Sequence, residues 1–259
     1  MEVFVGGQVG DLDVEDVIVV ADDVIGLPDF GERDDGTFER HDVRASVPGE
    51  ADADEVMIPA AFSSLFKTRW DWNYETTEQK QLHGRRTSWP RMKALGGCSA
   101  INAMISMRGQ AADYDHWRQL GLTGWGYDDV LPYFKKSEDY DGPDSPAHGK
   151  GGPLGVSQLR ALHPLAQTFV DACKEAGMRE IPDYCEGDID GAFINLATQR
   201  NGQRCSTAEG FLKPAMNRRN LQVITGATAD KILFEGKRAV GVRFLRGGAS
   251  YDIKVNGEV

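Results

Sequence analysis

The stretch Trp89–Gly109 reads WPRMKALGGCSAINAMISMRG, and a pair of glycines, Gly96 and Gly97, stands near its centre. Two adjacent glycines let the backbone turn sharply and approach a flat or anionic ligand closely. Small residues follow the pair, and the apolar run from Ala103 to Met107 is compatible with a helix. Because a loop that feeds a helix N-terminus is a ready anion site, this stretch predicts a loop–helix unit that binds a large phosphate-bearing cofactor.

The same stretch resembles the first signature of the glucose-methanol-choline (GMC) oxidoreductases, a family that binds FAD. It departs from the family pattern at Met92, where glycine is usual, and at Cys98, where serine is frequent. A glycine pair alone usually marks only a turn. Further stretches, however, resemble the family in the same order along the chain: Ile58–Phe62, Trp70–Tyr74, Asp113–Trp117, Gly124–Phe134 and Thr198–Ser206. The resemblance covers roughly residues 49–259.

This resemblance implies an α/β (mixed α+β) fold, with an incomplete FAD-binding domain of GMC type and part of an antiparallel-sheet substrate domain. It also implies a division of the chain into four segments. These are a divergent acidic segment of doubtful order (1–48), part of the FAD-binding domain with the glycine loop (49–152), part of the substrate domain (153–205) and a return to the FAD-binding domain (206–259).

The activity that the resemblance implies is FAD-dependent oxidation of the CH–OH group of an alcohol or choline-like small molecule, with hydride transfer to the flavin. The cofactor contacts of the family fall on Ala94, Gly96, Gly97, Asn102, Ala103, Met104, Ile105 and Ala229. Apolar packing explains Met104 and Ile105 equally well. Some family members attach the flavin to a histidine just before the asparagine of this loop. Ile101 stands there in this chain and cannot form that bond, so noncovalent FAD is expected.

No residue of this chain is assigned a catalytic role. The resemblance places the catalytic histidine in a C-terminal region that finds no match here, and His83 and His163 stand where the family has no base. Arg204 either contacts substrate or flavin or holds its own loop, and the second interpretation is favoured. We therefore expect the chain by itself to be inactive. The alternatives to an enzyme are a truncated or frameshifted gene product and a half that requires a second chain.

Charge is distributed unevenly along the sequence. Residues 1–56 contain 17 Asp or Glu and three Arg, whereas the remaining residues contain 26 Lys or Arg and 23 Asp or Glu. An acidic end argues against nucleic-acid binding, which needs a basic face. No apolar run reaches membrane-spanning length and no basic leader precedes an apolar stretch, so a cytoplasmic location is expected. The four cysteines show no spacing typical of a zinc site, and no metal is predicted.

The first residues do not form a convincing dinucleotide fingerprint. Gly7 and Gly10 have the last two spacings of G-x-G-x-x-G, but Val5 occupies the first position and several carboxylates follow. The run Val17–Val20 is strand-like where a helix would be expected after such a turn. Residues up to about 48 are therefore interpreted as unrelated to the family. The explanation is either a frameshift at the start of the gene or a divergent N-terminus.

Local patterns predict most of the remaining elements. Apolar spacing and turn residues indicate helices over 111–120 and 128–140, the second with Pro132 in its first turn, and a helix that begins at His163-Pro164 and ends at Gly177. The capping-box spacing of Ser206 and Glu209 indicates a helix to about Met216. Strands are predicted over 153–158, 221–225, 231–234 and 240–244, with a turn over 235–238.

Overall fold

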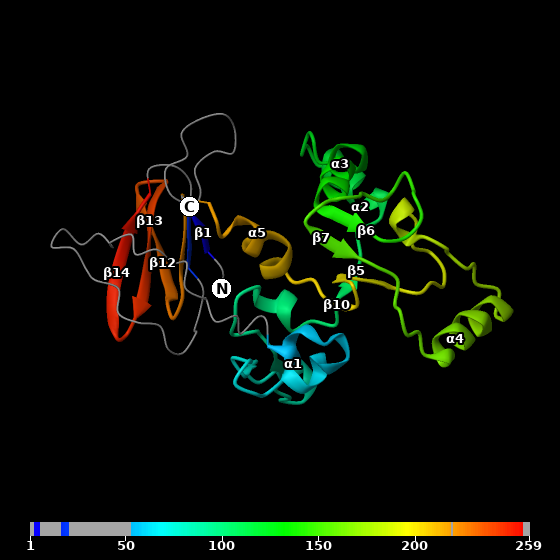
Figure 1. The fold of residues 1–259 in the computed structure, drawn as a ribbon, viewed down its shortest axis with the longest axis horizontal. Coiled ribbons are helices and arrows are strands. Elements are labelled where there is room, and N and C mark those ends of the chain that lie inside the picture. The colour runs from blue at the N-terminus through cyan, green and yellow to red at the C-terminus, as the bar shows by residue number, and fades with distance from the viewer. Residues whose placement is uncertain (1–2, 6–16, 21–52, 219, 256–259) are drawn as a thin grey trace. The chain divides into compact units, whose positions relative to one another are not determined.

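The computed structural model describes residues 3–5, 17–20, 53–218 and 220–255, and backbone alone in the first two ranges. The chain divides into two compact units, one made of Met1–Ile101 with Leu212–Val259 and the other of Asn102–Phe211. Figure 1 shows the elements of both units. The glycines Gly7 and Gly10 and most of the acidic segment 1–48 lie outside the described residues.

The first unit contains a three-stranded sheet whose members come from opposite ends of the chain. Its order is β1 (Val3–Val5), β2 (Val17–Val20) and β11 (Leu221–Ile224). β1 runs antiparallel to β2, and β2 runs parallel to β11. The strand-like character expected for Val17–Val20 is confirmed. The parallel pairing places the carboxyl ends of β2 and β11 at the same edge, which is where open α/β sheets bind ligands.

A second, antiparallel sheet follows directly in the sequence. It consists of β12 (Thr228–Glu235), β13 (Arg238–Arg246) and β14 (Ala249–Lys254), drawn in orange to red in Figure 1. Gly236, with φ of 61°, makes the turn between the first two strands. Phe244 is fully buried beside Ile224 and Ala227, and its ring stacks on Tyr251. The strands expected over 231–234 and 240–244 are confirmed and are longer than predicted.

The rest of the first unit consists of short elements around a compact apolar cluster. These are α1 (Asp54–Met57), the 3-10 helices η2 (Pro59–Leu65), η3 (Lys80–Leu82) and η4 (Gly97–Ala100), the paired strands β3 (Tyr74–Glu75) and β4 (Ser88–Trp89), and α5 (Lys213–Ala215). The buried cluster contains Val56, Leu65, Trp70, Met92, Ala94, Ala100 and Ile101. Residues on both sides of the glycine pair are thus anchored in one core.

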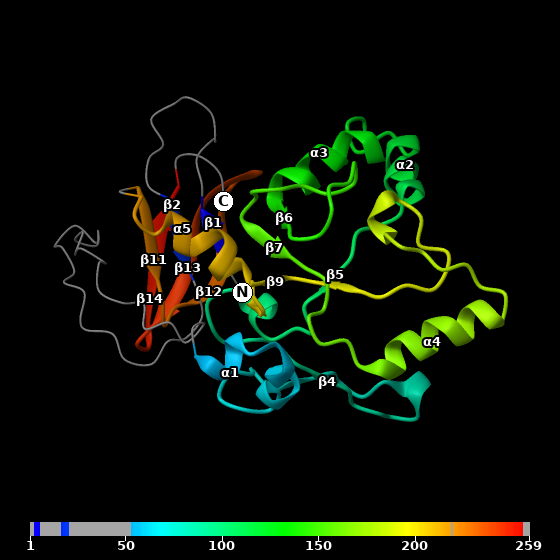
Figure 2. The same ribbon diagram turned by 45° about the vertical axis from the view of Figure 1, so that its right-hand side comes forward.

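The second unit combines three helices with three small two-stranded sheets. The helices are α2 (Ala111–Gln119), α3 (Tyr127–Ser137) and α4 (Pro164–Glu175), and two shorter helical segments are η5 (Tyr184–Glu186) and η6 (Ala208–Leu212). The boundary between the two units, after Phe211, falls within η6. The sheets pair β5 (Ile105–Ser106) with β8 (Leu196–Ala197), β6 (Glu138–Tyr140) with β7 (Leu154–Val156), and β9 (Gln199–Arg200) with β10 (Gln203–Arg204). In Figure 2, α2 and α3 lie side by side.

Two helices agree with the sequence prediction because their end signals are local. At the start of α2, Gln110 N donates to the Asp113 carboxylate, a carboxylate cap of the kind that favours a helix N-terminus. At the start of α4, His163 Nδ1 accepts from Leu165 N. Gly177, with φ of 89°, ends α4, and the bond from Met178 N to Cys173 O closes its last turn as in a Schellman motif.

Two predicted helices need correction. α3 ends at Ser137 because Glu138–Tyr140 pairs with β7 instead, and Pro132 lies inside the helix rather than in its first turn. The helix expected from Ser206 is a π-helical segment, Ala208–Leu212, followed by the short α5. Ser206 Oγ still accepts from Glu209 N at 3.3 Å.

The compact units also divide the chain differently from the sequence interpretation. Residues 102–152, which were grouped with the glycine loop, lie in the same unit as 153–205. The cause is nonlocal pairing, since β5 pairs with β8 and Arg204 binds Asn102. The mixed α/β class itself agrees with the structure. None of the helices in the described residues is both long enough and apolar enough to cross a bilayer.

Candidate functional site

The glycine pair forms a tight left-handed turn in the first unit. Gly96 has φ of 90° and Gly97 has φ of 49°, values that side chains strongly disfavour. Gly97 N donates to Ala94 O at 3.0 Å, Ser99 N to Gly96 O at 3.1 Å, and Ser99 Oγ to the same carbonyl at 2.5 Å. Among the described residues, a Cβ built on Gly97 would meet no atom within 4 Å. Gly96 is buried, but at Gly97 the turn leaves open space beside the backbone, as a close-approach site requires.

The helix expected after this turn does not form, and that prediction is wrong. η4 ends at Ala100, and β5 begins only five residues later. Met104, between them, has φ of 61°, which a right-handed helix excludes. The nonlocal pairing of Ile105 with Ala197 takes priority over the helix-compatible composition of residues 103–107. A helix N-terminus therefore does not supply an anion site here.

The eight predicted cofactor residues fall into two groups. Ala94, Gly96, Gly97 and Ala229 belong to the first unit, and Asn102, Ala103, Met104 and Ile105 to the second. Ala94 and Met104 are buried, so their side chains serve the core, while Asn102, Ala103 and Ile105 are exposed. The apolar-packing interpretation is therefore correct for Met104. It does not describe Ile105, whose side chain is 55% exposed.

A hydrogen-bond network fixes the backbone between Asn102 and Met104. Asn102 Oδ1 accepts from Met104 N at 2.9 Å and from Arg204 Nη1 at 3.1 Å, and Arg204 Nη1 also donates to Asn102 O at 2.8 Å. Met104 O accepts from Thr198 N at 2.7 Å. These bonds hold Met104 in the left-handed region, where a non-glycine residue is strained by about 1–3 kcal/mol.

Arg204 is the buried centre of this network. The residue is only 1% exposed, and burial lowers the pKa of its guanidinium to about 10. It stands on β10 after a tight Asn201-Gly202 turn, both residues of which have positive φ, as hairpin turns of this composition require. The contacts favour the interpretation that Arg204 holds the Asn102 loop.

Ala229 stands close to the edge where β2 and β11 end. β11 leads into Thr225–Ala227, in which Thr225 and Ala227 are buried. Ala229 follows at the start of β12, where it pairs with Phe244. A register shift follows Ala229 in that ladder. The parallel neighbour of β11 is β2, so this segment follows the carboxyl edge of a parallel strand pair, the place where such sheets bind nucleotides.

The described histidines have separate local roles. His163 caps α4, and His83 and His116 are exposed. His148 is buried in the second unit between two carboxylates, those of Glu138 and Asp183. Sequence patterns missed this network, because its members are up to 45 residues apart in the chain and show no regular spacing. Two of its members, His148 and Asp183, lie beside Cys185, and these three side chains carry donor atoms that could bind a metal ion.

Comparison with known proteins gives consistent matches. A family model described as GMC oxidoreductase matches residues 16–258. An uncharacterized GMC-type oxidoreductase of Mycobacterium tuberculosis is 41% identical over 209 residues, which are 78% of this chain and 39% of that protein. The oxygen-dependent choline dehydrogenase of Rhizobium rhizogenes is 40% identical over 205 residues, 79% of this chain and 37% of that protein. The chain thus spans about 40% of the length of these relatives.

Solved structures give the same result. Pyridoxine 4-oxidase from Mesorbium loti superposes with a TM-score of 0.72 at 31% identity, over 78% of this chain and 40% of the other. An FAD-dependent oxidoreductase from Chaetomium thermophilum superposes with a TM-score of 0.72 at 27% identity, over 80% of this chain and 38% of the other. One expectation is corrected: the family model begins at residue 16, so the likeness reaches into the segment interpreted as unrelated. β2, at its start, contributes a parallel sheet strand.

Proposed function

The chain belongs to the GMC oxidoreductase family, and from that premise we propose that it forms part of the FAD-binding side of an enzyme that oxidises the CH–OH group of an alcohol or choline-like substrate. The observation that carries the proposal is the Gly96–Gly97 turn, which lies within the matched region and leaves open space at Gly97 for a ligand to approach the backbone. The similarity to a choline dehydrogenase supports the substrate class.

The residues present fit one face of a flat, phosphate-bearing cofactor. A Cβ at Gly97 would project into open space rather than into protein, and the core under Ala94 and Ala100 holds the turn rigid. The backbone around Ala229, which belongs to the same unit as Gly97, would approach the nucleotide end of the cofactor. When bound, FAD supplies the hydride acceptor for the alcohol carbon. The role of this chain's residues is to position that acceptor.

The same arrangement supports noncovalent binding. Ile101 occupies the position where some relatives carry the histidine that bonds the flavin, and its aliphatic side chain is 2% exposed within the apolar cluster. An aliphatic side chain has no nucleophilic atom for such a bond. Acid precipitation of the FAD-loaded protein should therefore leave all flavin in the supernatant, and flavin absorbance retained in the pellet would contradict this.

Replacement of Gly97 by alanine tests the site. We expect Gly97→Ala to weaken FAD binding by about tenfold or more, equivalent to at least about 1.4 kcal/mol, because the new methyl group occupies the space that the cofactor approaches. Titration of the purified chain with FAD, followed by flavin fluorescence, measures the effect.

Gly236→Ala is the matched control. Gly236 also has a left-handed φ, at 61°, and the Cβ of an alanine there would likewise meet no described atom within 4 Å. Both variants should lose about 1–2 kcal/mol of stability from backbone strain, but only Gly97→Ala should lose FAD affinity. Equal FAD affinities in the two variants would refute the placement of the cofactor at this turn.

A second candidate is that these residues alone are an inactive product, or one part of an enzyme that needs a second chain. The observation that favours it is the 37–40% share of its relatives' length that the chain spans. The FAD titration separates the two candidates. Saturable binding by the unmodified chain supports the flavin-side proposal, whereas no binding at any FAD concentration supports the inactive product. Binding that appears only after addition of a separately expressed C-terminal region from a relative supports the two-chain form.

A further inference from the structure

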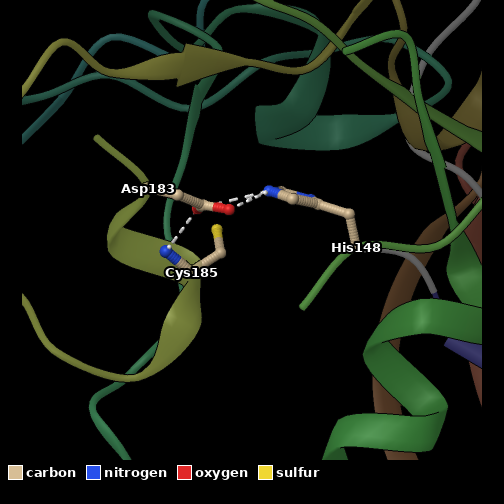
Figure 3. A group of neighbouring side chains, drawn as sticks. All are labelled: His148, Asp183 and Cys185. Atoms are coloured by element: carbon tan, nitrogen blue, oxygen red, sulfur yellow. Dashed lines mark hydrogen bonds and ion pairs between the residues drawn. The ribbon is translucent and has the colours of Figure 1, made fainter. Parts of the chain in front are cut away.

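Three different donor groups converge inside the second unit: the imidazole of His148, the carboxylate of Asp183 and the thiol of Cys185 (Figure 3). One donor atom from each lies within 4.8 Å of the other two. His148 and Cys185 are buried, and Asp183 is partly buried. His148 lies in the loop between β6 and β7, and the other two residues are at the start of η5. The group therefore joins two segments that are distant in the sequence.

The hydrogen bonds around His148 fix which ring nitrogen faces these donors. Nδ1 lies 2.8 Å from Glu138 Oε2, and the same carboxylate accepts from Gly149 N and pairs with Arg108. Burial raises the pKa of Glu138, but the bonds from His148 and Gly149 and the Arg108 charge outweigh it and hold that pKa below its usual range. Because the Glu138 carboxylate already accepts from Gly149 N and Arg108, it is placed as the acceptor for a proton on Nδ1, and this leaves Nε2 directed at Asp183.

Nε2 and Asp183 need a cation between them. Without one, the Nε2 lone pair would face a carboxylate whose oxygens lie 3.2 and 3.3 Å away. A proton on Nε2 would normally give a charge-assisted bond of about 2.7–2.9 Å, so the observed separation is long. In a tetrahedral zinc site with bonds of about 2.0–2.1 Å to nitrogen and oxygen, the two ligand atoms lie about 3.3 Å apart. The geometry thus fits a shared metal ion better than a shared proton.

We propose that His148 Nε2, a carboxylate oxygen of Asp183 and the Cys185 thiolate bind a Zn²⁺ ion, with water in the fourth position. Imidazole, carboxylate and thiolate are the three zinc ligand types of proteins. Glu138 supplies the carboxylate that orients a zinc-bound histidine, and Tyr140 stacks on the ring with centroids 3.7 Å apart. The Asp183 side chain is 22% exposed, which leaves a route from solvent.

Metal binding changes the chemical state of the thiol. Burial raises the pKa of the Cys185 thiol to about 11, so the metal-free site holds a neutral S–H group at neutral pH. On binding, a zinc–sulfur bond replaces the S–H bond and the proton passes to solvent. The two segments are then joined by an ion as well as by hydrogen bonds, and the second unit should gain stability.

Elemental analysis and cobalt spectroscopy test the proposal. The purified chain is stripped with a chelator, dialysed against Zn²⁺ and analysed for metal. We expect about one zinc per chain, and Co²⁺ in its place should produce the near-ultraviolet charge-transfer absorption of a thiolate ligand. Cys185→Ser should abolish that absorption and weaken zinc binding by at least about tenfold, while Asp183→Asn should weaken zinc binding and leave the thiolate absorption in place.

Cys205→Ser is the matched control, because Cys205 is the other buried cysteine of this unit and lies outside the donor group. It should retain both the zinc content and the cobalt absorption. Zinc content far below one per chain, or a cobalt spectrum unchanged by Cys185→Ser, would overturn the proposal and leave a protonated histidine as the bridging cation. If Cys185→Ser does not fold, the cobalt spectrum of the unmodified chain still decides whether a thiolate binds the metal.

Discussion

Replacement of Arg204 by methionine is expected to destabilise the second unit by about 2–4 kcal/mol, because charged hydrogen bonds contribute about 1.5–3 kcal/mol each and a buried acceptor left without its donor adds a desolvation penalty. Methionine retains most of the length of the side chain but donates no hydrogen bond. Asn102 O and Oδ1 would each lose a bond from Arg204 Nη1. Arg204→Lys, which keeps the charge and can donate to one of these acceptors, should recover part of the loss.

The loss should extend to the backbone that the network holds. Without Arg204, Asn102 Oδ1 would keep its bond from Met104 N but lose the donor that holds it in place, and the left-handed Met104 would relax toward an ordinary conformation. Hydrogen exchange should then accelerate at Met104 and at Thr198, whose N–H donates to Met104 O. Urea unfolding measures the stability change, and hydrogen-exchange mass spectrometry localises it.

Arg200→Met is the control for this substitution. Arg200 lies on the partner strand of the same hairpin, but its side chain is exposed. It pairs with Asp139 at 3.4 Å and donates to the carbonyls of Gly152 and Pro153 in solvent-exposed hydrogen bonds. Exposed ion pairs are worth about 0–1 kcal/mol, so this variant should differ little from the unmodified chain. Equal destabilisation by Arg200→Met and Arg204→Met, or unchanged exchange at Met104 in Arg204→Met, would show that Arg204 does not hold the loop.

Local signals predicted those elements whose ends are decided locally. Helices α2 and α4 start at side-chain caps within three residues of their first turn, and the β12–β13 turn needs only the glycine at position 236. The Gly96–Gly97 turn is of the same kind. It closes through bonds between neighbours three residues apart, and the freedom of glycine to adopt positive φ suffices to predict it.

Nonlocal pairing explains where the prediction of structure was wrong. Residues 103–107 are compatible with a helix, yet Ile105 pairs with Ala197, and Tyr184 bridges the two strands by donating to Ser106 O and accepting from Leu196 N. Such contacts override a weak local preference. One local pattern did indicate the structure of this region. Asn201-Gly202 is a composition typical of hairpin turns, and the turn places Arg204 opposite Gln199.

The same distinction applies to the two candidate sites. The glycine turn is contiguous, so a motif could identify it and the family to which it belongs. The donors His148, Asp183 and Cys185 come from two separate segments and become neighbours only through folding of the second unit. Cysteine spacing therefore predicted no metal site, since Cys185 is the only cysteine in the group and the nearest histidine in the sequence is not its partner.

Asp71→Asn is expected to cost about 2–4 kcal/mol of stability at neutral pH, because it leaves a partly buried N–H group without an acceptor and removes a buried charge that several N–H groups stabilise. Asp71 is 3% exposed. Its carboxylate accepts from the backbone N–H groups of Lys67, Asn73 and Arg91 at 3.0, 3.1 and 2.9 Å. Asparagine keeps one acceptor oxygen, but its NH₂ group would face an N–H donor.

The cost should depend on pH in a defined direction. Burial opposes the Asp71 charge, but the three backbone hydrogen bonds and nearby Arg91 outweigh it, so the pKa of Asp71 lies below its ordinary value in the folded chain. A group whose folded pKa is depressed contributes stability that is present above its unfolded pKa, about 3.9, and is lost as pH falls through the folded pKa. The difference between the unmodified chain and Asp71→Asn should therefore be full at pH 7 and shrink below about pH 4.

Hydrogen exchange of the peptides that cover residues 67–92, measured at pH 7, 5 and 3.5 with correction for the intrinsic rates, tests this expectation at the site itself.

Asp252→Asn is the control. Hydrogen bonding to Arg243 also lowers the pKa of Asp252, but that ion pair is exposed, so added salt should screen it. At high salt, Asp252→Asn should match the unmodified chain while Asp71→Asn remains destabilised. A destabilisation by Asp71→Asn that is constant from pH 7 to 3.5 would show that packing, rather than the Asp71 charge, holds the two left-handed residues beside it, Lys67 and Asn73.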